Sequence, residues 1–158
     1  MPDFVRKRNR LRSYDYASNN MYFITICTLD KACILCDPQD FSLTETGQTV
    51  MEAVESIPRL YEGISLMHYV IMPNHVHMLL LLNRSNTSVS TVVNQMKRHI
   101  SLQTGRPIWQ KSFFDHVVRN EADYLRIWEY IDENPKKWSI DRYNPDYETK
   151  TPPETVSQ

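Results

Sequence analysis

VIMPNHVHMLLLL, residues 70–82, is the segment from which the rest of the sequence is best interpreted. Its apolar run from His75 to Leu82 predicts a β-strand, and Pro73-Asn74 just before it is typical of a turn. Beyond His77 both faces of this strand are apolar, so we expect it to be central and covered on both sides.

The two histidines at the start of this strand are candidate metal ligands. Side chains alternate along a strand, so His75 and His77 point to the same face. Two neighbouring imidazoles can coordinate one divalent metal. A bare His-x-His pattern also fits two strand-end histidines that bond backbone or water. From this pair alone both interpretations stay open.

Length and composition indicate one ordinary globular domain. The chain has 158 residues, of which 41% are hydrophobic and 23% charged, and its net charge is −1. It contains no apolar run near the ~20 residues of a membrane span and no signal-type segment, so we expect a cytoplasmic protein without membrane contact. Three cysteines, an odd number, suit a reducing compartment better than a disulfide framework.

The predicted order of elements identifies the fold class. Strands are expected at 21–29, 64–72, 75–82 and about 113–118, and helices at 44–61, 89–104 and 121–134. This βαββαβ order, followed by a further helix, predicts an α+β protein with a ferredoxin-like, RNA-recognition-motif-like antiparallel sheet. We expect a basic arm at 1–20, the folded domain at 21–140 and a proline-containing, flexible tail at 141–158.

Two groups of cations are candidates for contact with nucleic-acid phosphates. Both the N-terminal group and the pair on the helix at 89–104 have a simpler explanation, as a solvated tail and as cations near a helix C-terminus. The candidates are Arg6, Arg8, Arg10, Arg12, Lys97 and Arg98.

The final predicted helix separates a core tyrosine from one that can reach a site. Spacing of i, i+3, i+4 and i+7 places Tyr124 on the core-facing stripe together with Ile127, Trp128 and Ile131. Tyr130 lies more than a quarter-turn from the centre of that stripe, and Asn134 follows one turn later on the same flank.

A tyrosine beside a bound metal suggests one particular chemistry. A phenol, with a pKa of about 10, is a poor nucleophile at pH 7. A metal on a phosphodiester neutralises charge and orients the phosphate for in-line attack, so that a tyrosine can form a covalent phosphate ester. From residue types alone, Tyr130 could equally be an ordinary aromatic at the edge of the surface.

The motifs taken together resemble a known family. Met72-Pro73-Asn74-His75-Val76-His77 and Tyr130-Ile131-x-x-Asn134-Pro135 are similar to the HUH single-tyrosine transposases, and most of all to the REP-associated tyrosine transposases. The similarity extends from residue 6 to residue 138 and includes the segments at 8–16, 22–28 and 109–120. A glycine that commonly precedes the first strand in this family is replaced by Asn20.

The resemblance implies a fold, an activity and roles for individual residues. It implies the ferredoxin-like sheet, nicking of single-stranded DNA near hairpins such as REP-like repeats, and a 5′-phosphotyrosine intermediate. It implies that His75 and His77 are metal ligands and Tyr130 the nucleophile, with Asn134 as a third ligand. Imidazoles alone would indicate zinc, whereas the family points to Mg²⁺ or Mn²⁺.

The sequence and its resemblance therefore favour a metal-dependent DNA-nicking and strand-transfer enzyme. One alternative is a non-catalytic module of the same fold that binds structured DNA or RNA, and another is a metal-dependent hydrolase that uses water. The sequence leaves open the DNA target, the choice between monomer and homodimer, and whether the tyrosine serves its own histidine pair or a partner's.

Overall fold

The structure, a computed structural model, describes residues 20–147. The elements in chain order are β1 (Met21–Cys27), the 3₁₀ helix η2 (Leu29–Lys31), α2 (Glu45–Leu60), β2 (Ile64–Ile71), β3 (His75–Leu82), α3 (Val89–Thr104), β4 (Phe114–Val117), α4 (Glu121–Glu133) and the 3₁₀ helix η3 (Pro135–Ile140). The predicted βαββαβ order with an added helix is confirmed, and the ends of each predicted helix and strand agree within two residues.

The four strands form one antiparallel sheet in the order β2-β3-β1-β4. β3 lies between β1 and β2, which confirms its predicted central position. In the β1–β3 register, Cys27 stands opposite His75 and Thr25 opposite His77. The His pair therefore lies where the N-terminal end of β3 meets the C-terminal end of β1.

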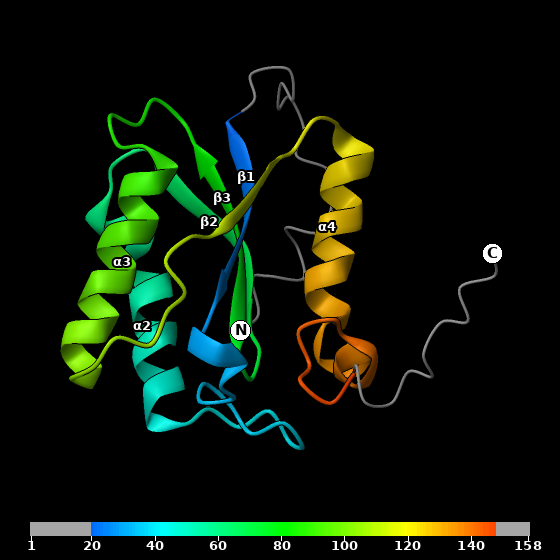
Figure 1. The fold of residues 1–158 in the computed structure, drawn as a ribbon. Helices are drawn as coiled ribbons and strands as arrows, with labels where there is room; N and C mark the ends of the chain where they lie inside the picture. The colour runs from blue at the N-terminus through cyan, green and yellow to red at the C-terminus, as the bar shows by residue number, and fades with distance from the viewer. Residues whose placement is uncertain (1–19, 148–158) are drawn as a thin grey trace, which may run out of the picture.

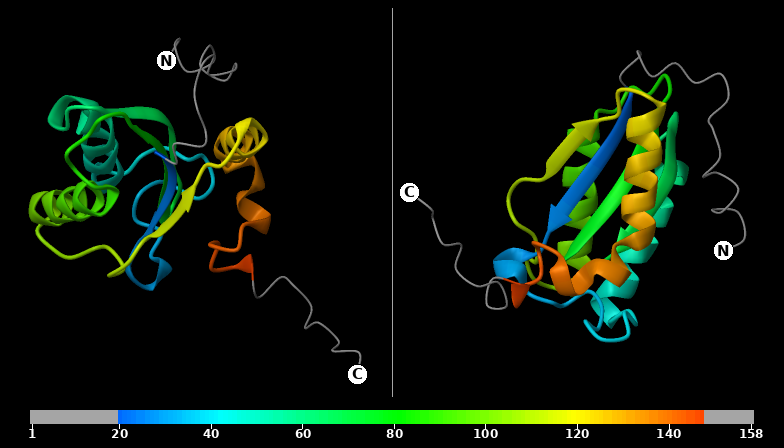
Figure 2. Two further views of the ribbon diagram at one scale, coloured as in Figure 1. Left: turned by 90° about the horizontal axis from the view of Figure 1, so that it is seen from above. Right: turned by 90° about the vertical axis from the view of Figure 1, so that its right-hand side faces the viewer.

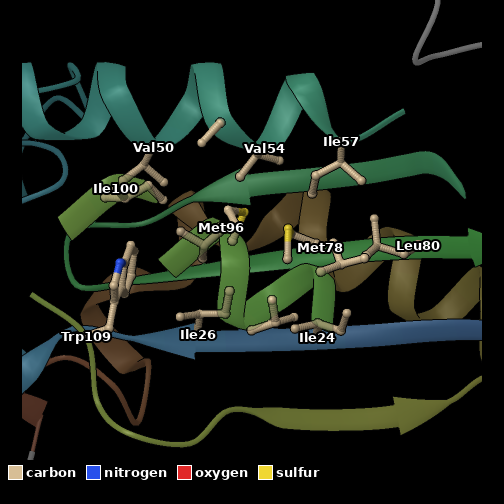
Figure 3. Packing of buried hydrophobic residues seen from close by; sticks show 14 of the residues in the cluster. Ile24, Ile26, Val50, Val54, Ile57, Met78, Leu80, Met96, Ile100 and Trp109 are labelled. Carbon is tan, nitrogen blue, oxygen red and sulfur yellow. The ribbon is translucent and has the colours of Figure 1, made fainter. Parts of the chain in front are cut away.

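The sheet is the middle of three layers. Helices α2 and α3 cover one face, and α4 covers the other (Figure 1; Figure 2). Alternation along β3 divides its side chains between the two faces: Val76 and Met78 belong to the larger core under α2 and α3 (Figure 3), while Leu79 packs with α4. His75 and His77 share the parity of Leu79 and so face α4.

Short-range signals set where the helices begin and end. The hydroxyl of Thr44 caps α2 by accepting from the Gly47 amide, Ser88 caps α3, and Asn120 caps α4 by accepting from the Asp123 amide. Gly105 ends α3 in the left-handed conformation, with φ of 78°. The cap fixes where α4 begins, and the packing of Tyr124, Ile127, Trp128 and Ile131 determines which side of the helix faces the sheet.

The chain beyond the predicted domain end at residue 140 packs against the domain. Asp141 and Asn144 are buried, and the Asn74 amide donates to the Tyr143 carbonyl at 2.7 Å. Residues 141–147 thus differ from the flexible tail expected for 141–158; the rest of that tail and the arm at 1–19 lie outside the described residues. Within 20–147, no helix is both long enough and apolar enough to span a membrane.

Candidate active site

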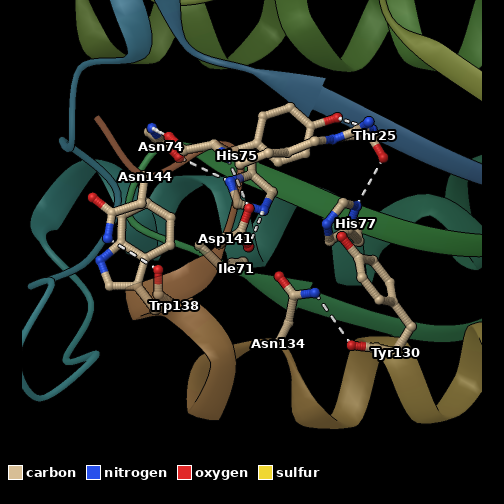
Figure 4. A network of polar contacts seen from close by, with 12 residues as sticks. Thr25, Ile71, Asn74, His75, His77, Tyr130, Asn134, Trp138, Asp141 and Asn144 are labelled. Carbon is tan, nitrogen blue, oxygen red and sulfur yellow. Dashed lines mark hydrogen bonds and ion pairs between the residues drawn. The ribbon is translucent and has the colours of Figure 1, made fainter. Parts of the chain in front are cut away.

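The two histidines of β3 form a buried pair under α4. His75 is 0% exposed and His77 1%, and their ring centroids are 4.7 Å apart at an interplanar angle of 72°. Figure 4 shows both rings on the same side of the strand, directed towards the C-terminal half of α4. The shared face expected from strand alternation is confirmed.

Each imidazole is held through its Nδ1 atom. His75 Nδ1 donates to Asn74 Oδ1 at 2.8 Å, and His77 Nδ1 lies 2.7 Å from Thr25 Oγ1, a contact that can form with the ring nitrogen as donor. In this tautomer the Nε2 lone pair of each ring is free for a ligand, the arrangement found around metal-binding histidines.

Three buried polar atoms without a hydrogen-bond partner among residues 20–147 gather at this pair. They are His75 Nε2, His77 Nε2 and Asn134 Oδ1; the fourth such atom, Trp109 Nε1, belongs to the core on the other side of the sheet. Leaving a buried polar atom without a partner costs about 1–3 kcal/mol, so such a cluster calls for an explanation. A cation bound by these atoms would supply one.

The surroundings keep both histidines neutral, the form that ligates metals. Burial lowers the pKa of His75 to about 3; the nearby Asn134 amide opposes this shift, and the Arg142 charge adds to it. Burial, and then the charges of His75 and Arg142, lower the pKa of His77 well below its usual value. No proton must therefore be removed at pH 7 before a metal binds.

Asn134 is brought to the pair by the end of α4. It is buried at the C-terminal cap, and its Nδ2 donates to the Tyr130 carbonyl at 3.2 Å, which fixes the amide (Figure 4). Among residues 20–147 no group of three His, Cys, Asp or Glu side chains could hold a metal. The third donor in this set is the amide oxygen, so the residues present fit a divalent cation.

Tyr130 differs from Tyr124 as the helix spacing predicted. Tyr124 is fully buried in the core beneath α4, whereas Tyr130 is 41% exposed and its ring centroid lies 5.2 Å from that of His77. Phe23 of β1 contacts the same tyrosine edge-on at 6.0 Å. The tyrosine is thus placed against the histidine pair while remaining open to solvent.

Three residues that follow η3 lie near the pair and were not predicted from the sequence: Asp141, Arg142 and Tyr143. Asp141 Oδ2 lies 3.9 Å from His75 Nε2, and the Tyr143 ring centroid lies 4.5 Å from that of His75. Burial raises the pKa of Asp141, although the Tyr143 amide and the Arg142 charge oppose this effect. A signal was present: Trp138 and Tyr143 are aromatic residues around an Asp-x-x-Asn turn, a pattern unusual in a solvated tail.

A second tyrosine therefore flanks the pair. Burial raises the pKa of Tyr143, and a hydrogen bond from Arg142, whose Nη2 donates to the phenol oxygen at 3.1 Å, opposes the shift. The side chain is half-buried. Its ring covers His75, whereas Tyr130 approaches His77 from α4.

Of the six predicted phosphate-contacting residues, the structure describes two, Lys97 and Arg98, and both lie on α3. Lys97 differs from the expectation: it is 8% exposed, and its ammonium donates to the carbonyls of Gln110 at 2.6 Å and Ser112 at 3.4 Å. The hydrogen bonds of Lys97 thus stabilise the segment before β4. Arg98 is exposed, but α3 lies across the sheet from α4. The other candidates, Arg6, Arg8, Arg10 and Arg12, lie outside the described residues.

A cavity of about 530 Å³ opens beside the tyrosine, between β1, β4 and α4. Its lining includes Phe23, His77, His116, Arg126, Tyr130 and Arg142. The exposed tyrosine, one histidine of the pair and two guanidinium groups therefore border one space.

Comparison with known proteins finds similar sequences and similar structures. No protein-family model matches the chain. A Haemophilus influenzae protein described as uncharacterized is 29% identical over 165 residues, spanning 87% of this chain and 92% of its own length. The REP-associated tyrosine transposase of Escherichia coli is 31% identical over 96 residues, which are 60% of this chain and 58% of that protein. Over this region the chain is similar in sequence to a REP-associated tyrosine transposase.

A solved structure of a REP-associated tyrosine transposase shares the fold. That protein, bound to a REP hairpin, superposes with a TM-score of 0.63 and 24% sequence identity over 82% of this chain and 73% of its own. The structure match confirms the expected α+β fold, and the sequence match confirms the expected resemblance.

Proposed function

We propose that this protein is a metal-dependent HUH endonuclease and strand transferase that nicks single-stranded DNA beside hairpins, such as REP-like repeats. The proposal rests mainly on one observation: three buried polar atoms without a hydrogen-bond partner lie beside the exposed Tyr130. These potential metal-ligating atoms are His75 Nε2, His77 Nε2 and Asn134 Oδ1. The kinship with REP-associated tyrosine transposases and the hairpin bound to the solved relative support it.

His75, His77 and Asn134 would hold Mg²⁺ or Mn²⁺. When bound, such an ion would neutralise charge on the scissile phosphate and orient it for in-line attack. The Asn134 amide oxygen suits Mg²⁺ or Mn²⁺, and the buried Asp141 side chain lies near His75.

The chain's own residues account for the transfer. The Tyr130 hydroxyl oxygen attacks the phosphorus and loses its proton to water, and the bond from phosphorus to the 3′ oxygen breaks. The leaving 3′ oxygen takes up a proton and becomes a free 3′-hydroxyl, while the 5′ phosphate remains on the tyrosine. Attack by another 3′-hydroxyl would reverse these steps, rejoin DNA and release Tyr130.

The chemical ends of the product test this proposal. A hairpin oligonucleotide with single-stranded flanks should be cut in Mn²⁺ and left whole in EDTA. The upstream fragment should carry a 3′-hydroxyl that a polymerase extends, and the downstream fragment should remain attached to protein. A downstream fragment with a free 5′ phosphate would instead indicate hydrolysis by water, and uncut DNA in Mn²⁺ would favour the binding module.

A further inference from the structure

Two large aromatic side chains are exposed on the α4 side of the sheet. Eight large hydrophobic side chains within residues 20–147 are exposed, and the aromatic ones among them are Phe114 and Tyr130. Phe114 is 64% exposed. Water-exposed aromatic rings on sheets of this kind commonly stack with unpaired bases.

The strand register places Phe114 next to the cavity. Phe114 of β4 stands opposite Thr25 of β1 in the antiparallel ladder, and directly opposed residues project from the same face. Thr25 contacts His77 and lines the cavity. The same rule places His116, opposite Phe23, on this face. Phe114 therefore extends the aromatic wall of the cavity to the open edge of the sheet.

Two guanidinium groups border this space. The side chain of Arg126, one turn before Tyr130 on α4, is largely exposed and is paired with the Asp123 carboxylate. That carboxylate also accepts from His116 Nε2 at 2.7 Å, so it holds the Arg126 and His116 side chains at one edge. Arg142 stands over the Tyr143 ring at 5.0 Å and also lines the cavity. Arginine forks match phosphate oxygens.

We propose that the cavity and Phe114 bind one unpaired nucleotide next to the scissile phosphate, with Phe114 stacking on its base and Arg126 and Arg142 contacting its phosphates. The inference rests on the proposed function, because the strand that enters is the one that Tyr130 cuts. A volume of about 530 Å³ lies within the range of about 300–1,000 Å³ for ligand pockets. Stacking accepts any base, so this subsite would position the strand without fixing its sequence.

The alternative occupant of this surface is a second copy of the chain. β4 is an edge strand with one paired side, and exposed edges can pair with another molecule. The two guanidinium groups favour the nucleotide, because their charges complement phosphate and would repel the same groups of a second copy.

Fluorescence of 2-aminopurine tests the subsite without cleavage. The probe is a DNA hairpin whose single-stranded flank carries 2-aminopurine at one position at a time, mixed with full-length protein in EDTA. Wild type should quench the probe at one flanking position, and Phe114→Ala should lose this quenching and bind roughly ten-fold more weakly. Phe114→Trp should restore both. Leu102→Ala, which removes an exposed side chain on α3, should behave as wild type.

The outcomes separate this proposal from the proposed function. Unchanged quenching and affinity in Phe114→Ala would overturn the subsite, even if Tyr130 cuts DNA normally. Loss of quenching in a protein that never cuts would support the subsite and refute the nuclease. In cleavage assays, Arg142→Gln should raise KM at least as strongly as it lowers kcat. If Phe114→Ala instead converts a sedimenting dimer to a monomer with DNA binding unchanged, β4 is a chain–chain interface and the proposal is wrong.

Discussion

Acidification should destabilise the fold through the buried histidines of β3. A histidine whose pKa is depressed in the folded state binds its proton more readily when unfolded, so stability present above the unfolded pKa of about 6.5 is lost as pH falls towards the folded pKa. For His75 that folded pKa is about 3, and for His77 it lies well below the usual value. The sensitive window therefore lies below pH 6.5.

The size of the effect follows from these shifts. Between pH 8 and pH 5, an unfolded histidine gains about 2 kcal/mol from protonation, and a folded one with a pKa of about 3 gains almost nothing. His75 should thus contribute about 2 kcal/mol of lost stability, and His77 up to the same amount. Against a total of about 5–15 kcal/mol for a typical domain, this loss is large.

Urea unfolding in EDTA at pH 8 and at pH 5 measures this loss of stability. Each of His75→Gln and His77→Gln should show a smaller fall in stability between pH 8 and pH 5 than wild type, by up to about 2 kcal/mol, and the double variant should show the smallest fall of all. Comparing each protein with itself at two pH values removes the effect of the substitution on basal stability. His99→Gln, an exposed position on α3, should keep the wild-type fall. Equal falls in wild type and the double variant would refute the burial argument.

Three further predictions concern metal, DNA and packing. Mn²⁺ should raise the melting temperature of wild type, should raise that of Asn134→Ala less, and should not change that of His75→Ala or His77→Ala. The two histidine variants should fold but fail to cut DNA. An equal rise in melting temperature in all four proteins would show that these residues do not bind the metal. DNA affinity should fall steeply as the salt concentration rises. Lys97→Met should leave the slope of log affinity against log salt concentration unchanged, because the Lys97 ammonium donates to backbone carbonyls. Arg98→Ala should reduce that slope by about one if the Arg98 side chain contacts a phosphate. Gly47→Ala should destabilise the fold by about 1–3 kcal/mol, because the added Cβ would lie 1.8 Å from the Leu35 carbonyl oxygen; unchanged melting would contradict this packing.

Local periodicity was enough to predict the sheet and much of the site. Alternation along the apolar strand placed His75 and His77 on one face, and helical spacing separated the buried Tyr124 from the exposed Tyr130. These properties depend on neighbours along one element, so the sequence carries them directly.

Residues positioned by distant contacts escaped the same reasoning. Lys97 was interpreted from the sequence as a cation near a helix C-terminus or as a contact for phosphate. Its carbonyl partners come from the segment before β4, 13 and 15 residues away. Tyr143 was assigned to a tail because prolines surround it, yet Asn74, 69 residues away, holds its backbone. Sequence periodicity contains no information about such pairings.

The identity of the attacking oxygen tests the central claim most directly. Two tyrosines flank the histidine pair, and the account assigns the attack to Tyr130 alone. With a labelled hairpin oligonucleotide and Mn²⁺, wild type and Tyr143→Phe should both form a denaturant-resistant protein–DNA adduct, mapped by mass spectrometry to the peptide that contains Tyr130. Tyr130→Phe should bind the DNA and form none. An adduct in Tyr130→Phe, or one mapped to Tyr143, would contradict the account.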